Sequence, residues 1–193
     1  MERFNDKEKE ILNGTIHLLN NGYTVDSIRM QIIANQCQMG KATIYDYFSN
    51  KDQLINSAFI YSFDLEIEKI KQLDISNLSY YDSLTYFAEN IARFHRNENT
   101  FKLITRNYTK ELIIKSFNVK FIEFKAVIHQ IYHQILLKGQ KENILDHVDL
   151  EYMTYIMDTL FEKYNITSSI YADDKALDKQ FEFIKRTIIN CAR

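Results

Sequence analysis

The sequence is poor in the residues that interrupt regular structure: among 193 residues it has no proline and four glycines. A β-sandwich or β-barrel needs turn residues at intervals of roughly 8–12 residues, and this chain does not supply them. The two cysteines, Cys37 and Cys191, are too few for a disulfide framework and lack the spacing of a metal site. The composition therefore predicts an all-α fold and a cytoplasmic location, where thiols stay reduced.

Long apolar runs and a strong net charge are also missing. No stretch of about 18 apolar residues occurs and the N-terminus has no apolar segment, so we expect neither a membrane helix nor a signal peptide. The net charge of −2 gives no support for general binding to polyanions, and any nucleic-acid role must rest on a local site. No Gly-rich phosphate loop, nucleophile elbow or Cys–His arrangement is present, which predicts that the chain is not an enzyme and uses no cofactor.

Apolar residues recur at helical spacing along most of the chain. Asn20-Asn21-Gly22 ends the first helix, with Gly22 placed for a left-handed C-cap, and Asp26 or Ser27 is expected to cap the second. The pattern predicts about nine helices, at about 6–21, 26–36, 41–48, 51–73, 80–96, within 101–117, and at 120–138, 150–171 and 174–192.

The segment from Gly40 to Leu54, GKATIYDYFSNKDQL, is compact and has two different faces. Positions 43–48 combine a hydroxyl, a branched apolar residue and three aromatics, and the polar pair Ser49-Asn50 follows. Because this helix is short and is followed by polar residues, we expect it to bury one face and to present the other to a partner. With the tight turn before it, the segment predicts a helix-turn-helix motif at about 29–48, in a DNA-binding domain of residues 1–54.

The same segment resembles the DNA-binding domain of the TetR family of transcriptional regulators. The family pattern is roughly I-A-x-x-A-G-V-S-x-G-T-[IL]-Y-x-[YH]-F-x-[SN]-K-x-x-L, which this chain resembles from Ile33-Ala34 to Leu54. Upstream, Asn21-Gly22-Tyr23 matches the family's N-G-[YF], and the similarity covers about residues 7–60. Three residues depart from the pattern, each a small residue in place of another: Cys37, Gly40 and Ala42. The chain also carries about two extra residues between Gly22 and Ile33.

The resemblance implies a homodimer that places two recognition helices in successive major grooves of near-palindromic double-stranded DNA. Lys41, Thr43, Tyr47 and Lys51 would contact phosphates, and Arg29 would reach one from the second helix. Ala42, Tyr45 and Asp46 would face base edges. The predicted DNA-binding residues are Arg29, Gly40, Lys41, Ala42, Thr43, Tyr45, Asp46, Tyr47 and Lys51. Because residues 1–54 hold six basic and seven acidic side chains, we expect a modest salt dependence.

By the same resemblance, residues 55–193 form a helical bundle that holds a small ligand and dimerises. The bundle is rich in Phe and Tyr, most of which are expected in its core, with a few polar groups lining a pocket. The predicted ligand-binding residues are Phe94, His95, Arg106, Phe121, Phe124, His129 and Tyr132. Residues 177, 181, 184 and 188 form a seam suited to helix pairing. The predicted dimer interface is Tyr152, Tyr155, Thr159, Leu177, Phe181, Ile184 and Ile188.

The sequence thus predicts a transcriptional regulator, a repressor that a small hydrophobic or amphipathic ligand releases from DNA. The alternative is a regulator of the same fold whose bundle binds a protein partner instead. His129 and His133 have the i, i+4 spacing of a metal-binding pair, but no nearby Cys or acid completes a tetrahedral set, so no metal is predicted. Glu66 and Glu68 are interpreted as solvated acids on a charged helix face.

Overall fold

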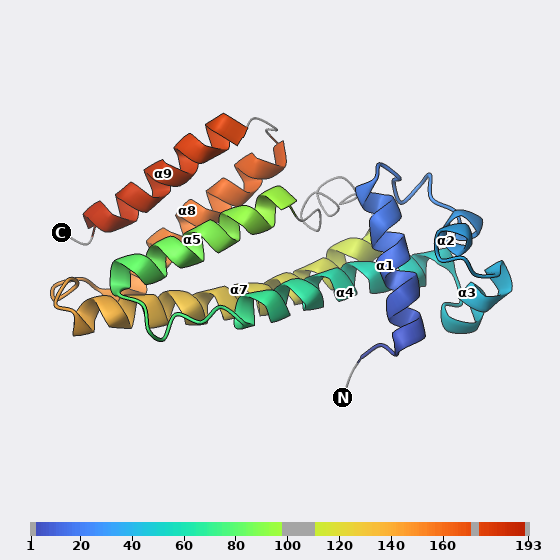
Figure 1. Cartoon of the computed structure of the whole chain (residues 1–193), viewed down its shortest axis with the longest axis horizontal. Helices are drawn as coiled ribbons and strands as arrows, with labels where there is room; N and C mark the ends of the chain where they lie inside the picture. The colour runs from blue at the N-terminus through green and yellow to red at the C-terminus, as the bar shows by residue number, and fades with distance from the viewer. Residues whose placement is uncertain (1–2, 98–110, 171–173, 192–193) are drawn as a thin grey trace. The chain divides into compact units, whose positions relative to one another are not determined.

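The structure is a computed structural model that describes residues 3–97, 111–170 and 174–191. Eight α-helices are the only regular elements in these ranges (Figure 1), which confirms the all-α prediction. They are α1 (Asp6–Asn20), α2 (Met30–Gln36), α3 (Lys41–Tyr47), α4 (Lys51–Lys71), α5 (Tyr80–Asn97), α7 (Glu111–Lys141), α8 (Leu150–Ile170) and α9 (Asp174–Cys191). None of these helices combines the length and the apolar character that crossing a bilayer requires.

The chain divides into two compact units. The first comprises Met1–Glu68 and Asn99–Phe124, and the second comprises Lys69–Glu98 and Lys125–Arg193. Because these boundaries fall inside α4 and inside α7, both helices contribute residues to each unit. The predicted division into domains after residue 54 stays a prediction.

The first unit contains two helices that are too short to be stable alone. α2 and α3 have seven residues each, and isolated helices shorter than about 12 residues are marginal in water. Burial stabilises them: Ile33 and Ala34 of α2 and Ile44 of α3 are fully buried. α1 begins with a capping box between Asn5 and Glu8 and packs against α2, which packs against α3. The orientation of α3 therefore depends on these contacts.

Three helices end in the same left-handed motif. The residue after the C-cap has a positive φ in each case: 99° at Gly22 after α1, 54° at Gln38 after α2 and 55° at Asn143 after α7. The N–H of the next residue then donates to a carbonyl five residues back, over 3.2, 2.9 and 2.8 Å respectively. This is the Schellman arrangement, and the Gly22 prediction is confirmed.

The predicted start of the second helix is wrong. Thr24 and Ser27 close a turn by reciprocal bonds: the Ser27 Oγ accepts from the Thr24 N–H at 2.8 Å, and the Thr24 Oγ1 accepts from the Ser27 N–H at 3.1 Å. Val25 and Ile28 of this turn are buried. Neither Asp26 nor Ser27 caps α2, which begins three residues later with extended Arg29 at its N-cap. The turn accommodates the longer connection between Gly22 and Ile33.

Two further predictions about the helices are wrong. α7 runs through the predicted break between residues 117 and 120, because that stretch contains no proline or glycine to end the helix. The predicted helical positions 101–110 lie outside the described residues. Glu66 is 2% exposed rather than solvated, because it follows Phe63 on the buried side of α4. The Lys120 Nζ also donates to the Asp64 carboxylate of α4 at 2.6 Å within the first unit.

In the second unit α5, α8 and α9 lie side by side (Figure 1). Aromatic rings pack against one another in the core of this unit. Tyr132 of α7 is 1% exposed, and its ring centroid lies 5.2 Å from Phe87 and 5.8 Å from Phe161. The Glu142 carboxylate accepts from the first N–H of α5, that of Tyr80, at 2.9 Å. The end of α7 therefore fixes the start of α5.

α1 and α2 approach each other closely at Gly14 and Cys37. A β-carbon on Gly14 would lie 2.5 Å from the Cys37 Sγ, which is nearer than two such atoms pack. Burial, followed by the charge of Glu10, raises the pKa of the Cys37 thiol. A half-buried thiol with a raised pKa is a poor nucleophile, which favours the predicted packing role for Cys37.

We expect Gly14→Ala to lower the free energy of unfolding by about 1–2 kcal/mol, because the added methyl group overpacks this contact. In a Cys37→Ala background the same change is expected to be neutral or stabilising, since the sulfur is gone and alanine favours a helix over glycine by about 1 kcal/mol. Urea unfolding of the four proteins measures the coupling between the two sites. An equal effect of Gly14→Ala in both backgrounds would contradict the contact.

Candidate functional site

The short helix α3 has one buried and one exposed face, as the sequence predicts. Ile44 is fully buried and Phe48, directly after the helix, is 2% exposed. Lys41, Ala42, Tyr45 and Asp46 are exposed, Thr43 and Tyr47 are half-buried, and exposed Gly40 is the extended N-cap. The predicted contact residues of α3 therefore gather on one accessible side, while its apolar side anchors it.

Three side chains on this face are available to a partner. The Lys41 Nζ lies 5.8 Å from the centroid of the Tyr45 ring, a cation–π contact that holds both side chains together. Tyr45 is 45% exposed. Among the described residues, Asp46 has no hydrogen-bond or ion-pair partner, and the same holds for exposed Arg29 at the N-cap of α2. The face thus offers a cation, an aromatic hydroxyl and a carboxylate to solvent.

Lys51 is engaged differently from the other predicted DNA-binding residues. Its Nζ donates to the carbonyl oxygens of Val25 at 2.9 Å and Ile28 at 3.3 Å. The ammonium group of α4 thereby joins the first turn of that helix to the turn that precedes α2. Spacing along the sequence gives no signal for this contact, because the acceptors are backbone groups more than twenty residues away.

The predicted ligand-binding residues are only partly brought together. His129 and Tyr132 lie in the second unit with ring centroids 6.3 Å apart. Phe124 belongs to the first unit and packs edge-on against Phe63 at 6.3 Å, so it acts there as a core residue. Burial, followed by the charge of Asp158, raises the pKa of Tyr132 well above its ordinary value. Arg106 and the side chains of Phe94, His95 and Phe121 lie outside the described residues.

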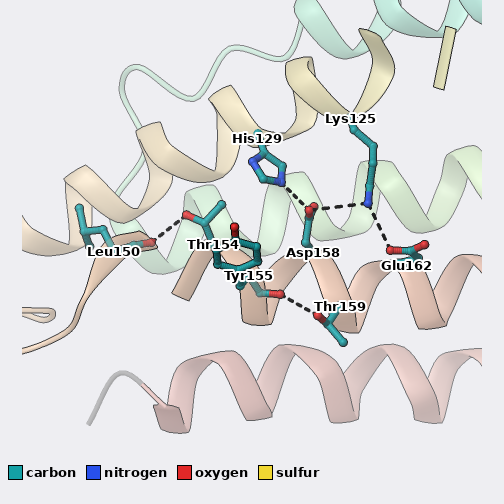
Figure 2. Close-up of polar contacts among 8 residues, drawn as sticks. All are labelled: Lys125, His129, Leu150, Thr154, Tyr155, Asp158, Thr159 and Glu162. Atoms are coloured by element: carbon teal, nitrogen blue, oxygen red, sulfur yellow. Dashed lines mark hydrogen bonds and ion pairs between the residues drawn. The ribbon is translucent and has the colours of Figure 1, made fainter. Parts of the chain in front are cut away.

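A row of charged side chains joins α7 to α8 (Figure 2). The His129 Nε2 contacts the Asp158 carboxylate, and the Lys125 Nζ lies 3.2 Å from the Glu162 carboxylate and 3.9 Å from that of Asp158. Next to this row is a groove of about 440 Å³. It is lined by His129, Gln130, His133, Glu151, Thr154 and Tyr155.

The groove includes residues that sequence reasoning missed. Gln130 was not named from the sequence, and His133 was considered only as a metal-binding partner of His129, although both lie within about one turn of His129 on α7. Glu151 and Thr154 come from α8, and no local pattern connects them to α7. In the part of the chain that the structure describes, no three His, Cys, Asp or Glu side chains are grouped as a metal site would require.

The predicted dimer residues on the last two helices differ in exposure. On α8, Tyr152 is 70% and Tyr155 63% exposed, and Thr159 is also exposed. On α9 the prediction is wrong for Phe181, Ile184 and Ile188, which are 7%, 2% and 0% exposed. These three side chains are buried within the protomer, where α9 packs on α5 and α8, and are not accessible to a partner. The side chain of Leu177 lies outside the described residues.

In this helix-turn-helix one face of α3 is buried and the other is accessible, which is the arrangement of a DNA-binding module. Residues 11–58 match the family model described as "Bacterial regulatory proteins, tetR family". Residues 11–58 are therefore similar to the DNA-binding domain of the TetR family, as the motif in α3 predicts. No protein among the curated sequences matches the chain.

Solved structures share the fold over nearly the whole chain. A TetR transcription regulator from Haloarcula marismortui has a TM-score of 0.69 and 18% identity, covering 98% of this chain and 97% of its own. MexZ, a repressor from Pseudomonas aeruginosa, has a TM-score of 0.71 and 12% identity over 98% and 96%. FadR from Bacillus subtilis, solved in complex with stearoyl-CoA, has a TM-score of 0.64 and 16% identity over 94% and 97%. The chain therefore shares the fold of these transcriptional regulators.

Proposed function

We propose that the chain is a repressor that binds operator DNA as a homodimer and leaves it when a small molecule occupies the C-terminal bundle. The observation that carries the DNA-binding part is the accessible face of α3, whose Lys41, Tyr45 and Asp46 project from an anchored helix. Two such helices in a dimer would enter major grooves about 34–36 Å apart, which requires a near-palindromic operator.

Exposed aromatic residues on α8 support the dimer. Tyr152 and Tyr155 are the large hydrophobic side chains that are exposed among the described side chains of that helix, and Thr159 continues the same side one turn further along. Large exposed aromatic side chains are enriched at protein interfaces because they bury much surface with little loss of side-chain entropy. A partner copy is therefore expected on α8, with exposed Phe183 of α9 as a further contact.

Regulation by a ligand is supported by two observations. The second unit has a groove of about 440 Å³ between α7 and α8, and a protein of the same fold was solved with stearoyl-CoA bound. A ligand that favours one dimer geometry by about 1–3 kcal/mol changes operator affinity roughly 5–150-fold. α4 is the natural connection, since it begins at the DNA-binding module and ends in the second unit.

Selection of bound fragments from random DNA, followed by a screen for compounds that release them, tests this function. We expect an enriched near-palindromic sequence and at least one compound that lowers operator affinity. Failure to enrich any sequence would contradict operator binding. If compounds that demonstrably bind leave operator affinity unchanged, release by a ligand is wrong, and a protein partner for the bundle becomes the better account.

Replacing Asp46 with alanine is expected to change which operator sequence is preferred. An exposed carboxylate on the recognition face can accept from the N4 amine of cytosine, and its loss should relax preference at one base pair per half-site by about 1 kcal/mol. Repeating the selection with the variant measures this. Thr43→Ser, a conservative change on the same helix, should leave the preferred sequence as it is. An unchanged preference for the Asp46 variant would show that this side chain does not face a base.

A further inference from the structure

We infer that the groove between α7 and α8 binds an organic cation, a molecule with a flat apolar body and a protonated amine or guanidinium group. The inference rests on the proposed ligand-regulated function and names the chemical class of its effector. Three observations support it: the direction of the hydrogen bonds around the groove, the balance of charge beside it, and an exposed aromatic ring at its side (Figure 2).

Two side chains on the α8 side of the groove, Thr154 and Glu151, offer acceptors. A carboxylate only accepts, so the His129 Nε2 donates its hydrogen to Asp158 and not to a ligand. The Thr154 Oγ1 donates its hydrogen to the Leu150 carbonyl at 2.8 Å and keeps only lone pairs for a ligand. The carboxylate of Glu151 also only accepts. A ligand that satisfies these groups must bring N–H or O–H donors.

The charged side chains beside the groove also favour a cationic ligand. Glu151 lines it, and Asp158 and Glu162 continue along the same side of α8. The ammonium group of Lys125 contacts the carboxylates of Asp158 and Glu162, and Glu151 is the carboxylate that lines the groove itself. An anionic ligand would meet a net negative surface, whereas a cation would compensate it.

Tyr155 completes the site and connects it to the dimer. Its ring lines the groove and is 63% exposed, so it can lie against a flat ligand and contact a cation over its face. Tyr155 also belongs to the exposed side of α8 that we propose as the dimer surface. Occupation of the groove would therefore act on the contact between the two copies, which is the step that ligand release requires.

Calorimetric titration of the full-length protein with tryptamine and with indole-3-acetate tests the inference, because the two probes share an indole ring and carry opposite charges. We expect saturable binding of one tryptamine per chain, at least about tenfold tighter than indole-3-acetate. Glu151→Gln should weaken tryptamine binding about tenfold, since it removes a charged acceptor. Glu89→Gln, which neutralises an exposed acid of α5 outside the groove, is the matched control and should bind as the parent does.

Three outcomes would overturn the inference: no tryptamine binding, equal affinity for both probes, or tryptamine binding that neither Glu151→Gln nor Tyr155→Ala weakens. Binding only by a monomeric variant would also overturn it, because a second copy would then occupy the groove.

The outcomes that would contradict the proposed function are different from these. If tryptamine binds through Glu151 but leaves operator affinity unchanged, the groove assignment stands and release by a ligand fails. If another compound releases the operator while tryptamine does not bind, the regulation stands and this groove is not its site.

Discussion

Replacing Tyr152 with glutamate is expected to convert the dimer into monomers and to lower operator affinity about 100-fold. Tyr152 is 70% exposed on α8, in the surface proposed for the partner copy. A glutamate side chain in this interface would lose its hydration on burial, which disfavours the dimer. The affinity falls because two linked DNA-binding domains gain about 10²–10⁴ over one.

Sedimentation velocity and fluorescence anisotropy with a labelled operator measure the two effects of the Tyr152 substitution. Tyr86→Glu is the matched control, since Tyr86 is 38% exposed on α5 and lies outside the proposed interface. The control should remain dimeric and bind DNA normally. A Tyr152→Glu protein that stays dimeric at micromolar concentration would show that the partner contacts another surface.

The dimer surface shows where reasoning from sequence fails in this chain. The four–three–four spacing of apolar residues in α9 correctly predicts a helix with one apolar side. The spacing does not say which neighbour covers that side. Phe181, Ile184 and Ile188 are buried by the chain's own helices, while Phe183 between them is 64% exposed. The partner of an apolar stripe depends on contacts between distant segments, which periodicity does not contain.

The DNA-binding module was more predictable because its signals are local. The residues that form α3 lie within a few positions of one another. The order of apolar and polar residues among them predicts which face is buried and which is exposed. The start of α2 was mispredicted although it is also local. Ser27 has the chemistry of an N-cap, but its hydroxyl instead pairs with Thr24 in a turn. A cap and a turn would use the same hydroxyl, and burial of Val25 and Ile28 favours the turn.

The groove in the second unit was only partly predictable from the sequence. Three of its side chains lie within about one turn of one another on α7, and His129 was a predicted ligand residue. Its other side comes from α8, and Glu151 is the residue that gives the groove its charge. Only the packing of the two helices puts Glu151 opposite His129. The charge of the proposed ligand was therefore not readable from the sequence, although the family resemblance implied a small hydrophobic or amphipathic ligand in this bundle.

Replacing Lys51 with methionine is expected to lower operator affinity about 10–100-fold without changing how affinity depends on salt. The Lys51 ammonium donates to the Val25 and Ile28 carbonyls, and loss of a charged hydrogen bond in a partly buried place costs about 1.5–3 kcal/mol. That loss would loosen the turn before α2 and the helices that depend on it. If Lys51 binds the protein's own backbone rather than phosphate, no counterion release is lost.

Lys41→Met is the matched comparison, because Lys41 is exposed on α3 and is expected to contact phosphate. Each phosphate contact contributes about 0.9 to the slope of log affinity against log salt, so a dimer that loses two contacts should show a slope smaller by about 1.8. Titrations of both variants between 50 and 200 mM salt, roughly the range over which such slopes are resolved, separate the two roles. A slope that falls equally in both variants would assign Lys51 to the DNA. A slope that stays at the parent value for Lys51→Met, with weaker binding at every salt concentration, identifies Lys51 as the residue that positions the recognition helix through the turn before α2.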